Sequence, residues 1–165
     1  PIYREKVWFI ISPHNPRKKK SSLLHERHRL QMVQIAIGDN NKLKASDVEF
    51  KLPQPSYTVN SLAYLKEKYP EHDFVLIMGG DNLGSFHKWK NYEEILKHHE
   101  LYVYPRQESP ETELSNHKKV KLVPAPRMEI SSTMIREAIK EKKDVRYFLP
   151  PAVWEYIKEM HFYEK

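Results

Sequence analysis

The chain has 165 residues, 39% of them hydrophobic and 12% aromatic, which is enough for a single domain over residues 1–165 with one core. It contains no cysteine, which excludes disulfides, thiolate metal sites and thiol catalysis. The net charge of +6 favours anionic ligands such as polyphosphates or nucleic acid, without choosing between them. The sequence shows neither an apolar run of membrane-spanning length nor a secretory signal, so we expect a cytoplasmic protein.

Short apolar runs predict the strands of a parallel sheet. The first run, Val7–Ile11, stops at Ser12-Pro13 and predicts a strand buried on both faces. Later runs predict three more strands, at Phe74–Met78, Leu101–Tyr104 and Val120–Val123.

Segments of helical period separate these runs. Leu30, Val33 and Ile37 recur at helical spacing and stop at Gly38, and a second helix follows Ser56. Two more helices are predicted near the C-terminus. The first should face inward with Ile135, Ala138 and Ile139. The second should face inward with Val153, Trp154, Ile157 and Met160.

This alternation predicts an α/β fold, a Rossmann-like parallel sheet with helices on both faces and a ligand crevice at the carboxyl ends of the strands. The segment Gln107–Lys119, which is rich in charged residues, is expected to be a mobile surface loop.

Two predicted helix starts could receive anions. Ser131, Ser132 and Thr133 open a helix with Arg136 one turn inside, a combination of free N–H groups, hydroxyls and a cation that suits phosphate oxygens. At the second start, Ser56 or Thr58 would cap a helix that runs to Lys68, and the backbone N–H groups of its first turn would be free to receive a carboxylate. From the pattern alone, each start is more often an ordinary helix cap than a ligand site.

A third block, Gly79-Gly80-Asp81-Asn82 followed by Trp89, comes where a buried strand ends. Glycine there lets a ligand approach the backbone, and Asp81 could accept hydrogen bonds from ribose hydroxyls. The face of Trp89 would attract a cationic pyridine ring, although a tryptophan is more often a core residue.

Together these blocks resemble the nicotinate mononucleotide adenylyltransferase family of the nucleotidyltransferase superfamily. Ile130–Arg136 matches the I-S-S-T-x-I-R signature at every defined position, and Ser56–Leu62 is similar to S-Y-T-x-x-T-L with a serine for the last threonine. Residues 79–89 keep the G-x-D and H-x-W spacings. The resemblance runs from Val7 to Tyr163 in the family's motif order.

The resemblance implies roles for individual residues. It assigns ATP to Ile130, Ser131, Ser132, Thr133 and Arg136, with Arg136 supporting catalysis. It assigns the nicotinate group to Tyr57 and Thr58, the pyridine ring to Trp89 and the ribose to Asp81. The weaker candidates are His14, Lys18, Arg29, Lys88 and Arg106. For His14 and Lys18, the loop after the first predicted strand departs from the P-P-H-K form of relatives.

The family's G-x-F-x-P-x-H-x-G-H motif, whose histidines grip the triphosphate in relatives, is absent from the sequence. The central catalytic residues therefore cannot be named. Because the first strand of such a sheet is central, we expect that Pro1 is not the biological start and that about 20 to 30 residues, a strand plus a helix, precede it.

The resemblance implies transfer of AMP from ATP to nicotinate mononucleotide, giving deamido-NAD and pyrophosphate. Mg²⁺ is expected to be carried by the ATP phosphates, with no metal ligand from the protein. We expect small-molecule substrates and no nucleic-acid or membrane partner, while homo-oligomerisation stays open. The alternatives are a pantetheine phosphate adenylyltransferase, which does not explain Asp81 with Trp89, and a basic module that binds nucleic acid without catalysis.

Overall fold

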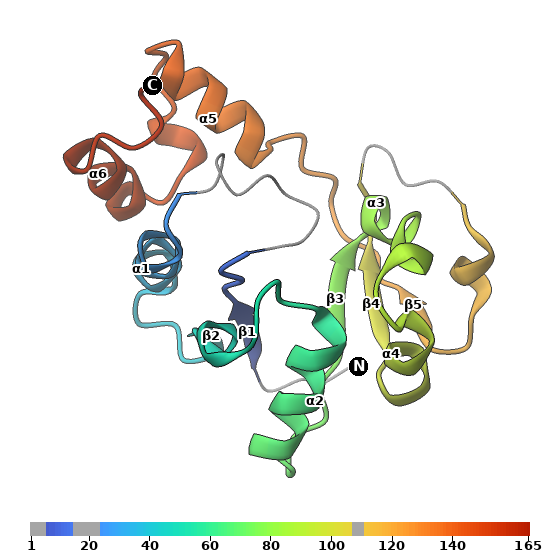
Figure 1. The fold of residues 1–165 in the computed structure, drawn as a ribbon. Helices are drawn as coiled ribbons and strands as arrows, with labels where there is room; N and C mark the ends of the chain where they lie inside the picture. The colour runs from blue at the N-terminus through green and yellow to red at the C-terminus, as the bar shows by residue number, and fades with distance from the viewer. Residues whose placement is uncertain (1–5, 15–23, 107–110) are drawn as a thin grey trace. The chain divides into compact units, whose positions relative to one another are not determined.

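The computed structural model describes residues 6–14, 24–106 and 111–165, and these residues belong to two compact units (Figure 1). Unit 1 comprises Pro1–Pro55 and Ile130–Lys165, and unit 2 comprises Ser56–Glu129. None of the helices in the described part of the chain has the length and apolar character needed to cross a membrane. The expectation of one domain over residues 1–165 stays a prediction.

Unit 1 contains a two-stranded parallel sheet. Strand β1 (Val7–Ile10) pairs with β2 (Leu43–Ser46), and helix α1 (Glu26–Ile37) connects them and packs on β2. The first predicted strand is thus confirmed, whereas β2 had no counterpart among the predictions. A short 3-10 helix, η2 (Val48–Lys51), follows β2.

The expectation that the first strand is buried on both faces is wrong. Val7 and Phe9, which point to the same side of β1, are 36% and 42% exposed. Among the described residues of unit 1, β2 alone pairs with β1, so a continuous apolar run does not by itself produce burial on both sides.

Helix α1 ends where the sequence predicts. The backbone N–H of Gly38 donates to the Gln34 carbonyl at 3.1 Å, and Gly38 has φ +56°, a left-handed conformation that glycine adopts without a steric penalty. Leu30, Val33 and Ile37 are half-buried, in agreement with the predicted helical period.

The C-terminal part of unit 1 forms a second core around α5 (Ser132–Lys140), the 3-10 helix η5 (Arg146–Phe148) and α6 (Pro151–Glu159). The buried residues of this core are Ile139, Val145, Val153, Ile157 and Phe162. The partly buried residues packed on them include Ile135, Ala138 and Trp154, so the predicted inward faces are confirmed for these positions. The prediction that Met160 faces inward is wrong, since Met160 is 40% exposed. Helix α6 ends at Glu159, so Met160 lies beyond the helix and does not follow its inward face.

Unit 2 contains a three-stranded parallel sheet in the order β3 (Leu76–Gly79), β4 (Leu101–Tyr104), β5 (Val120–Leu122). These are three of the predicted strands, with β3 beginning at Leu76 instead of Phe74. The helices of unit 2 are α2 (Thr58–Lys68), α3 (Gly80–Leu83) and α4 (Tyr92–His98), with 3-10 helices η3 (Phe86–Lys88) and η4 (Glu113–Asn116).

One side of this sheet is covered by the core of unit 2. Phe86 and Leu101 are fully buried at 0% exposure, and Leu62 of α2 and Ile95 of α4 pack in the same cluster. Helices α2 and α4 also pack on each other. The parallel sheets and their crossover helices confirm the predicted α/β class.

The segment expected to be a mobile loop is only partly described, since residues 107–110 lie outside the described residues. The remainder contains η4, at whose N-terminus the Thr112 N–H donates to Ser115 Oγ at 3.1 Å and the Ser115 N–H donates to the Thr112 carbonyl at 2.9 Å. The mobility of this segment stays a prediction.

Candidate functional site

The start of α5 is an exposed helix N-terminus with a cation one turn inside it. Ser131 is extended and its Oγ accepts a hydrogen bond from the Met134 N–H at 3.1 Å, so the predicted cap is Ser131 itself. Ser132, Thr133 and Arg136 are exposed, and Arg136 Nη2 donates to Thr133 Oγ1 at 3.1 Å. The helix dipole, the free N–H groups and the guanidinium together favour an anion at this position.

The Arg136 guanidinium also acts on Tyr163. Burial raises the pKa of the Tyr163 phenol, and the positive charges of Arg136 and Arg29 partly oppose this rise. The predicted ATP residue Arg136 and the weaker candidate Arg29 thus both influence the pKa of the same tyrosine in unit 1.

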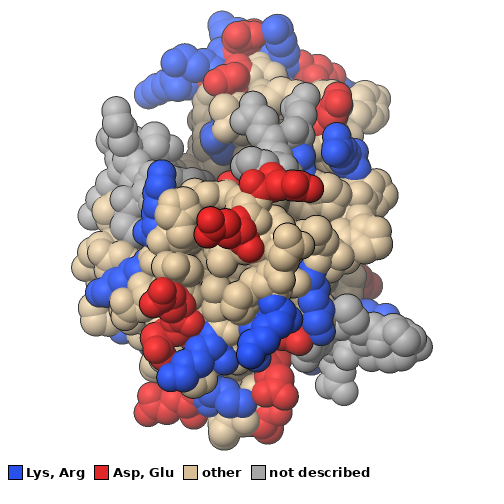
Figure 2. All heavy atoms as spheres, turned by 90° about the vertical axis from the view of Figure 1, so that its right-hand side faces the viewer, with Lys and Arg blue, Asp and Glu red and all other residues tan. Residues whose placement is uncertain are grey.

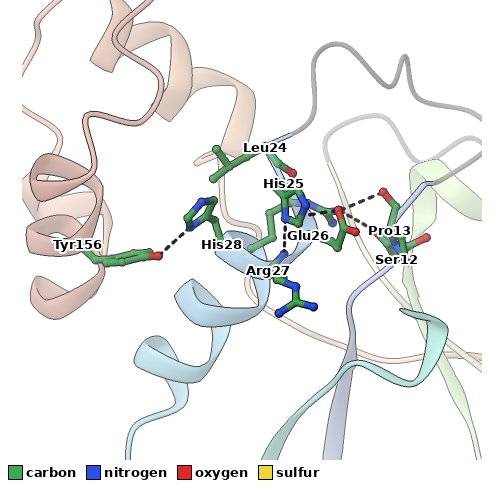
Figure 3. A network of polar contacts seen from close by, with 9 residues as sticks. Ser12, Pro13, Leu24, His25, Glu26, Arg27, His28 and Tyr156 are labelled. Atoms are coloured by element: carbon green, nitrogen blue, oxygen red, sulfur yellow. Dashed lines mark hydrogen bonds and ion pairs between the residues drawn. The ribbon is translucent and has the colours of Figure 1, made fainter. Parts of the chain in front are cut away.

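The Arg29 side chain donates hydrogen bonds to three backbone carbonyls. Its Nε donates to the Leu24 carbonyl at 2.9 Å, and its Nη2 donates to the carbonyls of Ser12 at 2.7 Å and Pro13 at 3.2 Å (Figure 3). These bonds tie the residues after β1 to the residues before α1. The candidate His14 directly follows Pro13 and is half-buried, whereas Lys18 lies outside the described residues.

A histidine that the sequence analysis did not select joins α1 to α6. His28 Nδ1 and the Tyr156 hydroxyl are 3.0 Å apart, and the two side chains face each other in Figure 3. The His28 ring also packs on Phe162, with 4.9 Å between ring centroids. This contact anchors α1, and with it Arg29, to the C-terminal core of unit 1.

In unit 2, the start of α2 differs from the prediction. The N-cap is Tyr57, whose carbonyl accepts from Asn60 and Ser61, and no side chain caps the helix. Ser56 and Thr58 are therefore not caps, because the chain is still extended at Tyr57 and Thr58 already lies in the first turn. No side chain in the described part of the chain caps the first N–H groups of that turn, which leaves them suited to a carboxylate.

The start of α2 lies next to the segment that carries Trp89. Lys90 Nζ lies over the Tyr57 ring, 4.3 Å from its centroid. Val59 and Trp89 pack against the same core cluster, and Trp89 also contacts Phe86 with 5.2 Å between centroids. The residues predicted for the nicotinate group and for the pyridine ring are thus held together in unit 2.

Asp81 and Arg106 follow the ends of two neighbouring strands. Gly79 of β3 is paired with Tyr104 of β4, and beyond this pair Arg106 Nε lies 3.7 Å from Asp81 Oδ1. A Cβ built on Gly79 would be 2.6 Å from Arg106 Cδ and closer still to the Asp81 carboxylate, so any larger residue there would require both side chains to shift. The weaker candidate Arg106 therefore shares one strand-end position with Asp81.

The remaining candidate of unit 2, Lys88, is exposed at the end of η3. In the view of Figure 2, basic and acidic side chains are interspersed, so on that face the net charge of +6 does not gather into one basic patch. The described residues include no group of three or more carboxylate or imidazole side chains placed to hold a metal ion.

The candidates divide between the units. The ATP residues Ile130, Ser131, Ser132, Thr133 and Arg136 belong to unit 1, and the mononucleotide residues Tyr57, Thr58, Asp81 and Trp89 belong to unit 2. In unit 2 the contacts above join Tyr57 to Lys90, the neighbour of Trp89, and join Asp81 to Arg106.

Comparison with known proteins agrees with these motifs. The cytidylyltransferase-like family model matches residues 3–138. The chain is 57% identical to a probable nicotinate-nucleotide adenylyltransferase of Flavobacterium johnsoniae, over 98% of this chain and 84% of the relative. It is 48% identical to the protein of the same name from Bacteroides thetaiotaomicron, over 94% of this chain and 77% of the relative.

The chain belongs to the nicotinate-nucleotide adenylyltransferase family. It is therefore an enzyme of the nucleotidyltransferase class, and the resemblance predicted from the motifs is confirmed. Its fold agrees with that of the Plasmodium falciparum nicotinic acid mononucleotide adenylyltransferase solved with NaAD, at a TM-score of 0.80 and 22% identity, over 97% of this chain and 83% of that one.

Two contacts among these residues have no signal in the sequence. Lys90 is a single lysine after a tryptophan, and nothing local indicates that it lies over the Tyr57 ring. The engagement of Arg29 with three carbonyls likewise depends on contacts over as many as 17 positions in the chain.

Proposed function

We propose that this protein transfers AMP from ATP to nicotinate mononucleotide, forming deamido-NAD and pyrophosphate. The observation that carries the proposal is the contact between the start of α2 and the Trp89 segment, because it gathers the residues assigned to the nicotinate group and to the pyridine ring. Family membership supports the nicotinate branch over the pantetheine branch.

Unit 2 would bind the mononucleotide. The free N–H groups at the start of α2 would receive the nicotinate carboxylate, near Tyr57 and Thr58. The indole face of Trp89 would attract the cationic pyridine ring by about 0.5 to 2 kcal/mol. Asp81, at the carboxyl end of β3, would accept hydrogen bonds from the ribose hydroxyls.

Unit 1 would bind ATP. The exposed start of α5 offers free N–H groups and the hydroxyls of Ser132 and Thr133 to the phosphates, and Arg136 adds a fixed positive charge. Ile130 precedes the cap Ser131 and is 36% exposed, which leaves its side chain accessible to the adenine.

The reaction itself needs no nucleophilic side chain. An oxygen of the mononucleotide 5′-phosphate attacks the α-phosphorus of ATP in line, the bond from that phosphorus to the α,β-bridging oxygen breaks, and pyrophosphate leaves. Alignment of the two substrates contributes up to about 7 to 11 kcal/mol to such a displacement. Mg²⁺ would arrive on the ATP phosphates and neutralise their charge, and no protein ligand to the ion is part of the proposal.

A competition assay tests the proposal. Purified protein is incubated with ATP and equal concentrations of nicotinate mononucleotide, nicotinamide mononucleotide and phosphopantetheine, and the products are identified by mass. Deamido-NAD as the main product supports the proposal, whereas dephospho-coenzyme A as the main product would contradict it. The absence of nucleic-acid partners, the cytoplasmic location and the oligomeric state stay predictions.

The Trp89→Ala variant tests the assignment of the pyridine ring. Calorimetric titration should show weaker binding of nicotinate mononucleotide, by about 2- to 30-fold for a contact of 0.5 to 2 kcal/mol, and little change for ATP. An equal loss of affinity for both substrates would remove Trp89 from this role.

A further inference from the structure

Lys90 carries a positive charge at a defined position beside the start of α2. Its ammonium nitrogen lies 4.3 Å from the centroid of the Tyr57 ring, and Tyr57 is the N-cap residue of α2. An ammonium at this distance is attracted by the face of the ring, so the contact gives a flexible lysine side chain a preferred location.

The backbone around Lys90 is held by successive hydrogen bonds. The Trp89 N–H donates to the Phe86 carbonyl at 2.9 Å, and the Tyr92 N–H donates to the Trp89 carbonyl at 3.2 Å. Between them Asn91 has φ +50°, the left-handed conformation that closes the turn. Because Phe86 is fully buried, this turn is anchored in the core of unit 2.

The charge of Lys90 is not neutralised by a neighbouring carboxylate. Among residues 6–14, 24–106 and 111–165, no Asp or Glu forms an ion pair with its ammonium, whereas Lys66, Lys97, Lys121, Lys143 and Lys158 each have such a partner. A cation that is fixed by an aromatic ring and left without a counter-ion is available to an anionic ligand.

Nicotinate and nicotinamide mononucleotides differ only in the group that the start of α2 would receive. The amide and the acid each offer an oxygen to backbone N–H groups, so these donors alone discriminate weakly. The acid has a second oxygen and a negative charge, whereas the amide is neutral and presents N–H donors in its place. A nearby ammonium therefore favours binding of the acid. The three N–H donors of the ammonium find no acceptor on the nitrogen of the amide.

We propose that Lys90 is a specificity-determining residue that selects nicotinate over nicotinamide mononucleotide by pairing with the ring carboxylate. This inference rests on the proposed function. It assigns the discrimination between the acid and the amide to the side chain that follows Trp89, in addition to the backbone N–H groups at the start of α2.

The test measures kcat/KM for both mononucleotides at saturating ATP, by pyrophosphate release, in Lys90→Met, Lys90→Arg and the unchanged protein. Lys90→Met should lower kcat/KM for nicotinate mononucleotide about tenfold, the effect of one hydrogen bond between charged groups, and leave the value for nicotinamide mononucleotide within about twofold. Lys90→Arg should keep most of the preference because it keeps the charge.

Lys68→Met is the matched control. Lys68 also lies over a tyrosine ring, 5.5 Å from the centroid of Tyr69, but at the opposite end of α2. This variant removes the same charge from unit 2 and should change neither kcat/KM value.

Three results would overturn the inference. Equal losses for both mononucleotides in Lys90→Met would place Lys90 at the 5′-phosphate, which both substrates share, or in the folding of the unit. Unchanged kinetics would remove it from the site. No pyrophosphate release by the unchanged protein with either mononucleotide would instead contradict the proposed function, and the inference with it.

Discussion

Replacing Gly79 with alanine adds one methyl group at the end of β3. The backbone of Gly79, at φ −75° and ψ 154°, is one that alanine adopts readily, so the effect comes from the space around the new Cβ. That atom would lie 2.6 Å from Arg106 Cδ and 3.1 Å from Arg106 Cγ, and closer still to the Asp81 carboxylate. Because carbon atoms in contact are about 3.5 to 4.0 Å apart, both side chains must move by about 1 Å.

The displacement should affect binding more than stability. Arg106 and Asp81 are 41% and 44% exposed, so both can move into solvent, and the free energy of unfolding should fall by less than about 1 kcal/mol. A hydrogen bond from a ribose hydroxyl to the carboxylate is worth about 1.5 to 3 kcal/mol, and its loss would lower kcat/KM for nicotinate mononucleotide about 10- to 150-fold.

A double-mutant cycle separates this explanation from general damage. Pyrophosphate release is measured for Gly79→Ala, Asp81→Asn and the double variant, with each substrate varied in turn. If the methyl group acts by displacing the Asp81 carboxylate, the double variant should lose little more than Asp81→Asn alone. The reasoning is refuted if Gly79→Ala changes kcat/KM for the mononucleotide by less than twofold, or if the two losses simply add.

Three further predictions concern stability. Phe86→Ala should lower the free energy of unfolding in urea by about 3 to 5 kcal/mol because Phe86 is fully buried, and a loss below 1 kcal/mol would contradict its place in the core. Ser131→Ala should cost about 1 kcal/mol through loss of the cap on the Met134 N–H and raise KM for ATP, whereas an unchanged KM would separate the cap from ATP binding. The raised pKa of Tyr163 keeps its phenol protonated in the folded state while the unfolded chain ionises near its ordinary value of 10.0, so stability should fall as the pH rises above this value. Tyr163→Phe should weaken that fall, and an identical pH profile would exclude the contribution.

The strands of unit 2 could be predicted because each is an apolar run closed by a glycine, a proline or a loop. Strand β2 could not, since Leu43–Ser46 has a single large apolar residue and is a strand only through its pairing with β1. Burial was also overpredicted for β1, because the sequence does not reveal how many strands surround it. Local apolar content thus predicts that a strand exists, while its exposure depends on its neighbours.

The helix caps likewise separate into one that a local pattern predicts and one that it does not. Ser131 was predicted correctly because its hydroxyl bonds a residue three positions along the chain, a purely local contact. At α2 the caps predicted from Ser56 and Thr58 are wrong, since the helix begins after Tyr57, where the chain leaves an extended conformation. The cationic partner of Tyr57 comes from a segment more than 30 positions away, and no local pattern predicts such a contact.

Calorimetric titration of the protein with nicotinate mononucleotide, in parallel with nicotinamide mononucleotide and phosphopantetheine, tests most directly whether unit 2 recognises a pyridine acid. We expect saturable binding of nicotinate mononucleotide that is at least about tenfold tighter than that of the amide, and no measurable binding of phosphopantetheine. Tighter binding of phosphopantetheine than of either pyridine mononucleotide would contradict it.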